Sequence, residues 1–186
     1  DLDNQIHLVL GRQIAPYGYG YLIILDGRGT IAVAYKKKEN KHKDILKKLI
    51  EFVSDSIGID IRKYQEFSSF GSFNYHKSKI DSSGRMYIGE AGGFQDYLFG
   101  FGIQYAVESA VLAAESYREN VSFDRLWKKR LRGYMRVAYR NRKFFERLND
   151  QHFYNICKVL SRSGNPVDLL RSRSRPGILD KVLNFI

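Results

Sequence analysis

The residues best suited to bind a ligand lie in one glycine-rich segment. Three of the five residues in Gly89–Gly93 are glycines, which let a ligand approach the backbone closely. Glu90, within this run, can accept hydrogen bonds from a sugar-like diol. Gly100 and Gly102 precede an apolar run that begins at Ile103, and they would leave the N–H groups at the start of a helix uncovered, where negative charge is favoured. The pattern indicates a cofactor site, and the alternative is a tight turn whose glycines serve only packing.

Other patterns of catalytic or metal-binding residues are missing from the sequence. His7, His42, His76 and His152 show no metal-ligand spacing with one another or with Cys157. Neither a Gly-x-Ser-x-Gly elbow nor a Gly-x-x-x-x-Gly-Lys-Ser/Thr phosphate loop occurs. The sequence therefore gives no support to the ordinary hydrolases and nucleotide triphosphatases, and no metal is expected.

Length and composition favour a folded, cytoplasmic protein. The chain has 186 residues, of which 44% are hydrophobic and 14% aromatic, so a disordered protein is excluded. The longest uncharged apolar runs, such as Tyr19–Leu25, fall far short of the about 20 residues that a membrane-spanning helix needs. A secretory leader is not visible, and one cysteine cannot form an internal disulfide, which suits a reducing compartment.

The chain is strongly basic, with 31 Lys and Arg residues against 20 Asp and Glu and a net charge of +11. Ten basic and two acidic residues lie between Asp124 and Arg147. Such a surface attracts nucleic acid, anionic lipid or a phosphate-bearing ligand, although it is also typical of a solvated helix face. Four basic residues would share one helix face, namely Arg132, Arg136, Arg140 and Lys143. The interleaved aromatic residues, which suit either base stacking or a buried face, are Tyr134, Tyr139, Phe144 and Phe145. A non-enzymatic module that binds nucleic acid or an anionic membrane is therefore an alternative, but no recognised nucleic-acid fold signature is present.

The first half of the chain predicts strands followed by a helix. Ile6–Tyr35 is β-rich, and Asp26–Gly29 is typical of a hairpin turn between two strands. An amphipathic helix should follow and end at Gly58. Its apolar residues recur at the helical period, at Ile45, Leu46, Leu49, Ile50, Val53 and Ile57. Gln65–Tyr75, rich in Phe, Ser and Gly, reads as strand with irregular turns.

The second half predicts a short strand and then helices. Met86–Ile88 is the strand that leads into the glycine-rich turn, and Phe101–Arg118 is a long helix. The expected buried face of this helix comprises Ile103, Ala106, Val107, Ala110, Val111 and Ala114. Basic helical character continues from Phe123 to about Arg162. The fold class is therefore α/β in the broad sense, a mixed α+β fold in which strands come first and helices last.

The glycine-rich segment resembles the second flavin-contacting motif of the geranylgeranyl reductase family, within the FAD-dependent oxidoreductases of the para-hydroxybenzoate hydroxylase type. That motif reads Gly-Asp-Ala-Ala-Gly-Phe, a short loop, and Gly-x-Gly-Ile before a helix with Ala, Ser and Ala-Ala. The counterparts here are Gly89–Phe94, Gly100–Ile103, Tyr105–Ser109 and Ala113–Ala114, at preserved spacing. The resemblance implies a mixed fold with an antiparallel substrate-domain sheet followed by helices.

A weaker resemblance extends over most of the chain. Residues 15–22 and 29–33 are similar to a strand pair that lines the substrate cavity in this family, and Leu126–Trp127 and Asn141–Arg142 are similar to its C-terminal helical part. The resemblance implies three parts: a partial substrate domain (1–84), a flavin-binding strand–loop–helix segment (85–119) and a basic helical region (120–186). Candidates for an apolar substrate wall, each equally explained as core, are Tyr17, Tyr19, Tyr21 and Phe73.

The family resemblance implies the role of each site residue. Glu90, where the family has Asp, would bind the ribitol of FAD, and the N–H groups of Ala91 and Gly92, within Gly89–Gly93, would face its phosphate side. The amides of Gly100, Phe101, Gly102 and Ile103 would face the pyrimidine end of the flavin ring. NADH or NADPH would donate electrons to the flavin, for the reduction of an isoprenoid double bond or the hydroxylation of an aromatic ring. The sequence names no catalytic acid.

The chain also departs from the family by an absence. The Gly-x-Gly-x-x-Gly fingerprint that binds the FAD pyrophosphate does not occur. We therefore expect the chain to match the C-terminal part of such a flavoprotein. An N-terminal flavin-binding half or another chain should then complete the sheet at Met86–Ile88. A basic surface would also suit peripheral association with an anionic membrane.

Overall fold

The computed structural model describes residues 4–36, 44–61, 64–71 and 79–166, with residues 168, 169, 172, 175 and 176. The chain divides into two units, one made of Asp1–Ser68 and Glu146–Arg162 and the other of Ser69–Phe145 and Ser163–Ile186. These boundaries differ from the three functional parts expected from the sequence, because the segment 85–119 and most of the basic helical region share one unit. The mixed fold of an antiparallel sheet followed by helices is confirmed.

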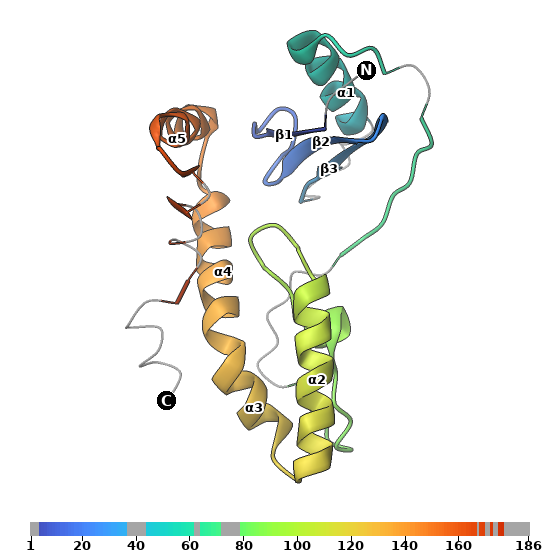
Figure 1. The fold of residues 1–186 in the computed structure, drawn as a ribbon, viewed down its shortest axis with the longest axis vertical. Helices are drawn as coiled ribbons and strands as arrows, with labels where there is room; N and C mark the ends of the chain where they lie inside the picture. The colour runs from blue at the N-terminus through green and yellow to red at the C-terminus, as the bar shows by residue number, and fades with distance from the viewer. Residues whose placement is uncertain are drawn as a thin grey trace. The chain divides into compact units, whose positions relative to one another are not determined.

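The first unit is built on an antiparallel sheet with the strand order β1-β2-β3 (Figure 1). Its strands are β1 (Gln5–Val9), β2 (Tyr19–Leu25) and β3 (Arg28–Ala34). The predicted hairpin is confirmed: Asp26 and Gly27 connect β2 to β3, and both are left-handed, with φ of 50° and 73°. This turn has the twist that antiparallel strands need, and Asp-Gly is among the sequences that adopt it most readily.

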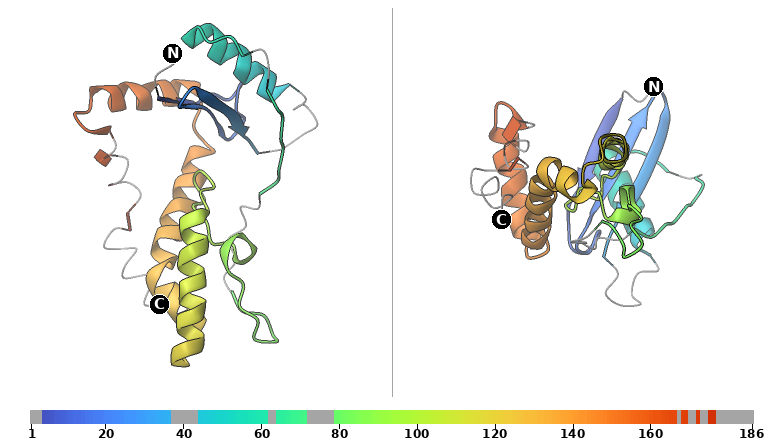
Figure 2. Two further views of the ribbon diagram at one scale, coloured as in Figure 1. Left: turned by 45° about the vertical axis from the view of Figure 1, so that its right-hand side comes forward. Right: turned by 90° about the horizontal axis from the view of Figure 1, so that it is seen from below.

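One face of the sheet is covered by α1 (Ile45–Ile57), as Figure 2 shows. The helix ends at Gly58, which is left-handed with φ of 75°, so both the helix and its predicted end are confirmed. The core between helix and sheet consists of Val9, Leu22, Ile24, Leu49 and Val53. A Cβ on Gly20 would lie 2.7 Å from Leu49 Cδ1, so any side chain at this position would require Leu49 to shift.

Helix α5 (Asp150–Arg162) belongs to the same unit and is attached to it through Arg12. The Arg12 backbone N–H donates to Asp150 Oδ1 at 2.7 Å. Its guanidinium donates twice to the carbonyl oxygen of Leu148, at 2.7 and 2.6 Å, and lies 4.4 Å from the centre of the Tyr17 ring. Residues far apart in sequence are thus joined by charge-assisted hydrogen bonds.

Between residues 79 and 145, the second unit contains a 3₁₀ turn and three α-helices. These are η1 (Gly89–Gly92), α2 (Ile103–Glu119), α3 (Phe123–Arg130) and α4 (Arg132–Phe145). Helix α2 ends at the left-handed Asn120, and the chain turns back into α3 and α4, so that α2 and α3 form a helical hairpin (Figure 1). The basic helical region predicted from Phe123 to Arg162 is confirmed as α3, α4 and α5.

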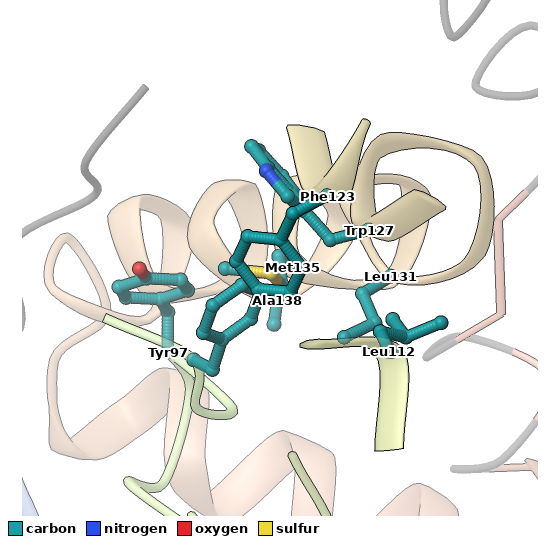
Figure 3. Close-up of a cluster of buried hydrophobic side chains, with 8 residues drawn as sticks. Tyr97, Leu112, Phe123, Trp127, Leu131, Met135 and Ala138 are labelled. Carbon is teal, nitrogen blue, oxygen red and sulfur yellow. The ribbon is translucent and has the colours of Figure 1, made fainter. Parts of the chain in front are cut away.

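Aromatic side chains fill the core of this unit (Figure 3). The cluster comprises Phe94, Tyr97, Leu112, Phe123, Trp127, Leu131, Met135 and Ala138. Phe94 packs edge-on against Trp127, with 5.7 Å between ring centres. Because Phe94 and Tyr97 come from the loop between η1 and α2, this core fixes that loop against α3 and α4.

Two sequence predictions about elements are wrong. Residues 64–71 contain neither helix nor strand, so the strand predicted over Gln65–Tyr75 is absent there, and its remainder lies outside the described residues. The predicted buried face of α2 is also wrong. Ser109 and Leu112 are buried instead, whereas Ile103, Val107 and Val111 are 85%, 60% and 55% exposed.

Lys79 is the most unusual group in the second core, because its side chain is only 1% exposed. Its ammonium nitrogen lies 5.0 Å from the centre of the Phe94 ring and 5.3 Å from that of Trp127. Burial lowers its pKa from 10.5 to about 8, although the charge of Asp124 acts in the opposite direction. A buried ammonium disfavours the charged form, and neighbouring aromatic faces offset only part of the cost.

The free energy of unfolding should therefore rise with pH between 8 and 10.5, since the unfolded chain binds the Lys79 proton more tightly in that interval. Across this interval, the free energy of unfolding should rise by about 3 kcal/mol through Lys79. This figure follows from the lowering of its pKa from 10.5 to about 8, at about 1.4 kcal/mol for each tenfold change in proton affinity. Urea unfolding of the wild-type chain and of Lys79→Met at pH 7.5 and 10.5 measures this. Lys79→Met should be the more stable at pH 7.5, and its advantage should shrink at pH 10.5. An advantage independent of pH would contradict the prediction.

Among the helices that the structure describes, none is long and apolar enough to cross a membrane. The residues that the structure describes also contain no group of three or more His, Cys, Asp or Glu side chains that could hold a metal ion.

Candidate flavin-contacting site

The glycine-rich turn is a single 3₁₀ turn with a left-handed end. Gly89–Gly92 form η1, and Gly93 closes it with φ of 65°. The Gly93 N–H donates to the Glu90 carbonyl oxygen and the Phe94 N–H to that of Gly89, each at 2.8 Å. The side chains of Glu90 and Ala91 are exposed. The turn thus leaves the Glu90 side chain accessible to a ligand, with Oε1 close to Gly71.

Ser109, which is fully buried on α2, fastens this turn to the helix. Its hydroxyl oxygen accepts the Gly89 N–H at 2.9 Å and donates to the Ala106 carbonyl oxygen at 3.0 Å. A Cβ on Gly89 would lie 3.4 Å from the Cβ of Ala106. The turn therefore rests directly on the second turn of α2.

Ser109→Ala should destabilise this unit by about 1–3 kcal/mol, because the buried N–H of Gly89 would lose its acceptor. Thermal or urea unfolding measures the loss. Ser161→Ala on α5 is a matched control, since Ser161 makes the same hydroxyl-to-carbonyl bond on an exposed helix surface and should cost little. Equal costs for the two variants would show that the Gly89 bond contributes nothing.

The loop between the turn and α2 is organised by Asp96. Its carboxylate accepts the N–H groups of Leu98 and Phe99, at 3.2 and 3.0 Å. Its backbone N–H donates to the Phe101 carbonyl oxygen, and its carbonyl oxygen accepts the Gly100 N–H, both at 2.8 Å. Gly100 has φ of 81°, which a residue with a side chain rarely adopts. The sequence analysis missed Asp96, although Asp at the start of a turn that contains glycine was the available signal.

Arg142 of α4 also holds the loop between η1 and α2, through a hydrogen bond to its backbone. Its side chain is 8% exposed, and Nη1 donates to the Leu98 carbonyl oxygen at 3.2 Å. In the sequence Arg142 is one of the ten basic residues between Asp124 and Arg147, and its neighbouring residues do not distinguish it from those on the surface. It positions the loop that leads into α2 and does not contribute to a basic patch.

Helix α2 begins at an open position. Gly102 precedes the helix and has no side chain that could accept a hydrogen bond from the N–H groups of the first turn. The first turn also contains no acidic residue. A Cβ added to Gly102 would meet nothing within 4 Å. The N–H groups at the start of a helix carry partial positive charge, so this end favours an anionic or hydrogen-bond-accepting ligand.

Tyr105 adds a neutral hydroxyl in the first turn of α2. Burial, together with the charges of Asp96 and Glu108 and a contribution from Tyr134, raises its pKa to about 12. The phenol therefore stays protonated and uncharged throughout the physiological pH range, so it does not repel a negatively charged ligand.

The glycines of the segment fall into three classes. At Gly92 a Cβ would lie 2.3 Å from the Tyr87 carbonyl oxygen, so packing alone requires glycine there. Gly89, Gly93 and Gly100 have positive φ and serve the backbone path. Gly102 has φ of −114° and open space around it, so neither packing nor backbone conformation requires glycine. Gly102 is the position where a ligand best explains the residue.

The structure brings both halves of the predicted site onto the first two turns of α2. Gly89 lies against Ala106, whose N–H in turn donates to the Gly102 carbonyl oxygen at 2.8 Å. Phe101 and Ile103, beside Gly102, are 67% and 85% exposed. The predicted strand Met86–Ile88 is not formed: in the described part of the chain its only β-pairing is an isolated bridge between Met86 and Ile80. The reason is that three residues with a single partner cannot build a ladder.

Only two of the four residues predicted to form a substrate wall lie together on one surface. Tyr19 and Tyr21 stack on one face of β2, with 6.3 Å between ring centres, on the side away from α1. Ile6 and Leu8 of β1 share that face and are 73% and 56% exposed. Tyr17 instead has φ of 57° and lies against the Arg12 guanidinium, and Phe73 lies outside the described residues.

The basic helices show both kinds of aromatic residue. Tyr139 packs edge-on against Tyr97, and Phe145 packs against Phe99, so these two rings serve the interior. Tyr134 and Phe144 are 48% and 63% exposed. Part of the positive charge is neutralised within the unit, by the ion pairs Lys128–Asp124 at 2.7 Å and Arg130–Glu115 at 3.0 Å.

Comparisons with known proteins agree with the resemblance seen in the sequence. No family model matches the chain. It is 22% identical over 181 residues to a digeranylgeranylglycerophospholipid reductase of Methanocaldococcus jannaschii, covering 89% of this chain and 46% of that protein. It also matches the crystal structure of a geranylgeranyl bacteriochlorophyll reductase-like protein from Thermoplasma acidophilum, with a TM-score of 0.72 and 19% identity. That match covers the whole of this chain and 48% of the other, so the chain spans about half the length of both proteins. The resemblance to geranylgeranyl reductases is confirmed, and so is the fold that it implied.

Proposed function

We propose that the chain forms the flavin-contacting part of an FAD-dependent reductase that saturates isoprenoid double bonds. The observation that supports this most directly is the open start of α2 at Gly102, held beside the η1 turn by Ser109. The two matched proteins, whose names are those of geranylgeranyl-type reductases, support the reaction class.

The residues present fit one portion of FAD. The exposed Glu90 carboxylate would accept a ribitol hydroxyl, and the N–H groups of Ala91 and Gly92 would face the phosphate side. The open amides at Gly102 and Ile103 would receive the pyrimidine end of the ring, where the helix start favours negative charge by about 1 kcal/mol or less. A fingerprint for the pyrophosphate is missing from the sequence, so these residues alone would hold FAD weakly.

Bound FAD would supply the redox chemistry, taking a hydride from NADH or NADPH and delivering it to the substrate double bond. The protein residues provide position and environment. Asp96 and Arg142 hold the loop that presents Gly102, and the partly buried Tyr105 hydroxyl stays neutral and adds no negative charge to the helix start. The apolar sheet face with Tyr19, Tyr21, Ile6 and Leu8 would form a wall for an isoprenoid chain.

A chimeric protein tests this function directly. The chain would replace the portion of the Methanocaldococcus jannaschii reductase that it matches, and the purified chimera would be examined for flavin absorbance and for consumption of NADH or NADPH with a geranylgeranyl lipid. Bound flavin and lipid-dependent oxidation of the nicotinamide are expected. A folded chimera without flavin would contradict the cofactor assignment, and one with flavin but no lipid-dependent turnover would contradict the substrate class.

Peripheral association with an anionic membrane is a second part of the proposal, together with a cytoplasmic location. Lys143 and Phe144 are exposed side by side near the end of α4, and the two side-chain types suit lipid headgroups and the acyl boundary. Flotation of the chimera with phosphatidylglycerol vesicles, but not with phosphatidylcholine vesicles, is the expected result. Equal flotation with both, or competition by DNA at the same residues, would contradict it.

A further inference from the structure

Lys79 contacts the chain on both sides of the η1 turn. Its carbonyl oxygen accepts the Tyr87 N–H at 2.8 Å, in the extended segment that leads into η1. Its ammonium nitrogen lies 5.0 Å from the ring centre of Phe94, which follows the turn. The Phe94 N–H in turn donates to the Gly89 carbonyl oxygen at 2.8 Å and so closes η1. One buried residue thus holds the segments before and after the turn that presents Glu90.

Helix α3 fixes the position of Lys79. The Asp124 carboxylate accepts the Lys79 backbone N–H and also the Trp127 indole N–H, the latter at 2.8 Å. The Trp127 ring centre lies 5.3 Å from the Lys79 ammonium nitrogen and 5.7 Å from the ring centre of Phe94. The ammonium is therefore held against two aromatic rings, and its place is set by a helix outside the glycine-rich segment.

The buried charge of Lys79 costs stability. Its side chain is 1% exposed, and replacement by the apolar methionine is expected to stabilise the unit at neutral pH. Departures of this kind from an apolar core occur mainly at functional sites. An ammonium is attracted to the faces of both rings and so constrains their orientation, whereas a methionine packs against rings in several conformations. The charge can thus serve the arrangement of the neighbouring turn at the expense of stability.

We propose that Lys79 is a positioning residue of the candidate flavin-contacting site. Its ammonium holds the Phe94 ring, its carbonyl oxygen holds the Tyr87 N–H, and the η1 turn is thereby fixed between them. Lys79 acts through this turn and makes no contact with the ligand itself. The inference rests on the proposed function only for the identity of that ligand, because the effect of Lys79 on the turn exists without FAD.

Hydrogen exchange in the 186-residue chain tests the positioning in the absence of flavin. The amides of Gly93 and Phe94, which close η1, report whether the turn is formed. In Lys79→Met their protection at pH 7 should fall by about fivefold, equivalent to about 1 kcal/mol, while the free energy of global unfolding rises. A purely structural role would change protection and stability in the same direction. Protection that stays unchanged, or that rises with stability, would overturn the proposal.

Lys128→Met is the matched control for the loss of one positive charge. The Lys128 ammonium also lies near the Trp127 ring, 5.7 Å from its centre, and pairs with the Asp124 carboxylate at 2.7 Å. Its side chain is 39% exposed, in contrast to the buried Lys79. The protection of the η1 amides should stay at the wild-type level in this variant. An equal loss in both variants would assign the effect to the Trp127 and Asp124 pair and overturn the role of Lys79.

FAD binding to the chimera is the second measurement. Lys79→Met should weaken FAD binding at pH 7 by about three- to tenfold although the variant is the more stable protein. Burial lowers the pKa of Lys79 to about 8, so the wild-type affinity should also fall as the pH rises through this value. The affinity of Lys79→Met should not follow this pH dependence.

The ionisable groups that face Lys79 and its contacts do not titrate in the same interval. Burial of Asp124 raises the pKa of its carboxyl, but hydrogen bonds from Lys128 and Trp127 bring it below 3.8. A hydrogen bond to Asp81 raises the pKa of the Tyr87 hydroxyl above 10.0. The Lys128 ammonium pairs with Asp124, and Lys128→Met shows whether it contributes to the pH dependence.

The two measurements separate this inference from the proposed function. A wild-type chimera without FAD would contradict the proposed function, and the exchange experiment alone would then decide whether Lys79 positions the turn. A chimera that binds FAD equally well with lysine and with methionine would leave the proposed function intact and overturn the role of Lys79 in the site.

Discussion

Gly102→Val is expected to abolish flavin binding while leaving the fold intact. Apart from its chain neighbours, a valine Cβ at this position meets no atom of the described residues within 4 Å, and φ of −114° is an ordinary value for valine, so the described structure accommodates the side chain. The isopropyl group would fill the space in front of the N–H groups at the start of α2, where the flavin ring is proposed to lie. Loss of flavin absorbance in the chimera, with a change in unfolding free energy of about 1 kcal/mol or less, measures the effect.

Gly92→Ala is the matched comparison, because it changes a glycine of the same segment by a single methyl group. That methyl would lie 2.3 Å from the Tyr87 carbonyl oxygen, so the turn must shift and the second unit should be strongly destabilised. The two glycines therefore predict opposite outcomes: flavin lost with the fold kept at Gly102, and the fold lost at Gly92. A valine variant at Gly102 that keeps its flavin would show that the space serves no ligand.

Local signals in the sequence predicted the elements that depend on neighbouring residues. The Asp26–Gly27 hairpin follows from the left-handed preference of those two residues, and α1 with its end at Gly58 follows from apolar periodicity and a C-terminal glycine. The path of the glycine-rich segment, including Gly93, depends in the same way on positive φ.

Features that depend on distant contacts were not predictable. Arg142 and Lys79 acquire their roles only because the loop after η1 folds onto α3 and α4. The burial of Ser109 could not be predicted for the same reason, because its hydrogen bond with the Gly89 N–H joins residues twenty positions apart.

The orientation of α2 shows a deeper limit of periodicity. The stripe of Ile103, Val107 and Val111 is visible in the sequence, and the expectation that it is buried assumed that the apolar face of a helix packs on the core of its own unit. Periodicity identifies an apolar face and carries no information about which residues lie against it.

Glu90→Ala should weaken FAD binding by about ten- to a hundredfold, because a hydrogen bond to a charged group contributes roughly 1.5–3 kcal/mol. The side chain is exposed in the η1 turn, so its removal should change the unfolding free energy much less than it changes FAD affinity. Titration of the flavin-free chimera with FAD, followed by flavin fluorescence, gives the dissociation constants.

Glu90→Asp separates the carboxylate from other properties of the residue. The flavin motif that the glycine-rich segment resembles has aspartate at this position, and the exposed turn leaves room for a side chain one methylene shorter, so near-normal affinity is expected. Glu90→Gln keeps the length and removes the charge, and it should fall between the aspartate and alanine variants, because a neutral amide accepts a weaker hydrogen bond than a carboxylate. The order Glu, Asp, Gln, Ala in decreasing affinity would assign a charged acceptor to Glu90. Equal affinity for all four would show that the ribitol lies elsewhere, and the cofactor contacts would then rest on the backbone amides of η1 and α2 alone.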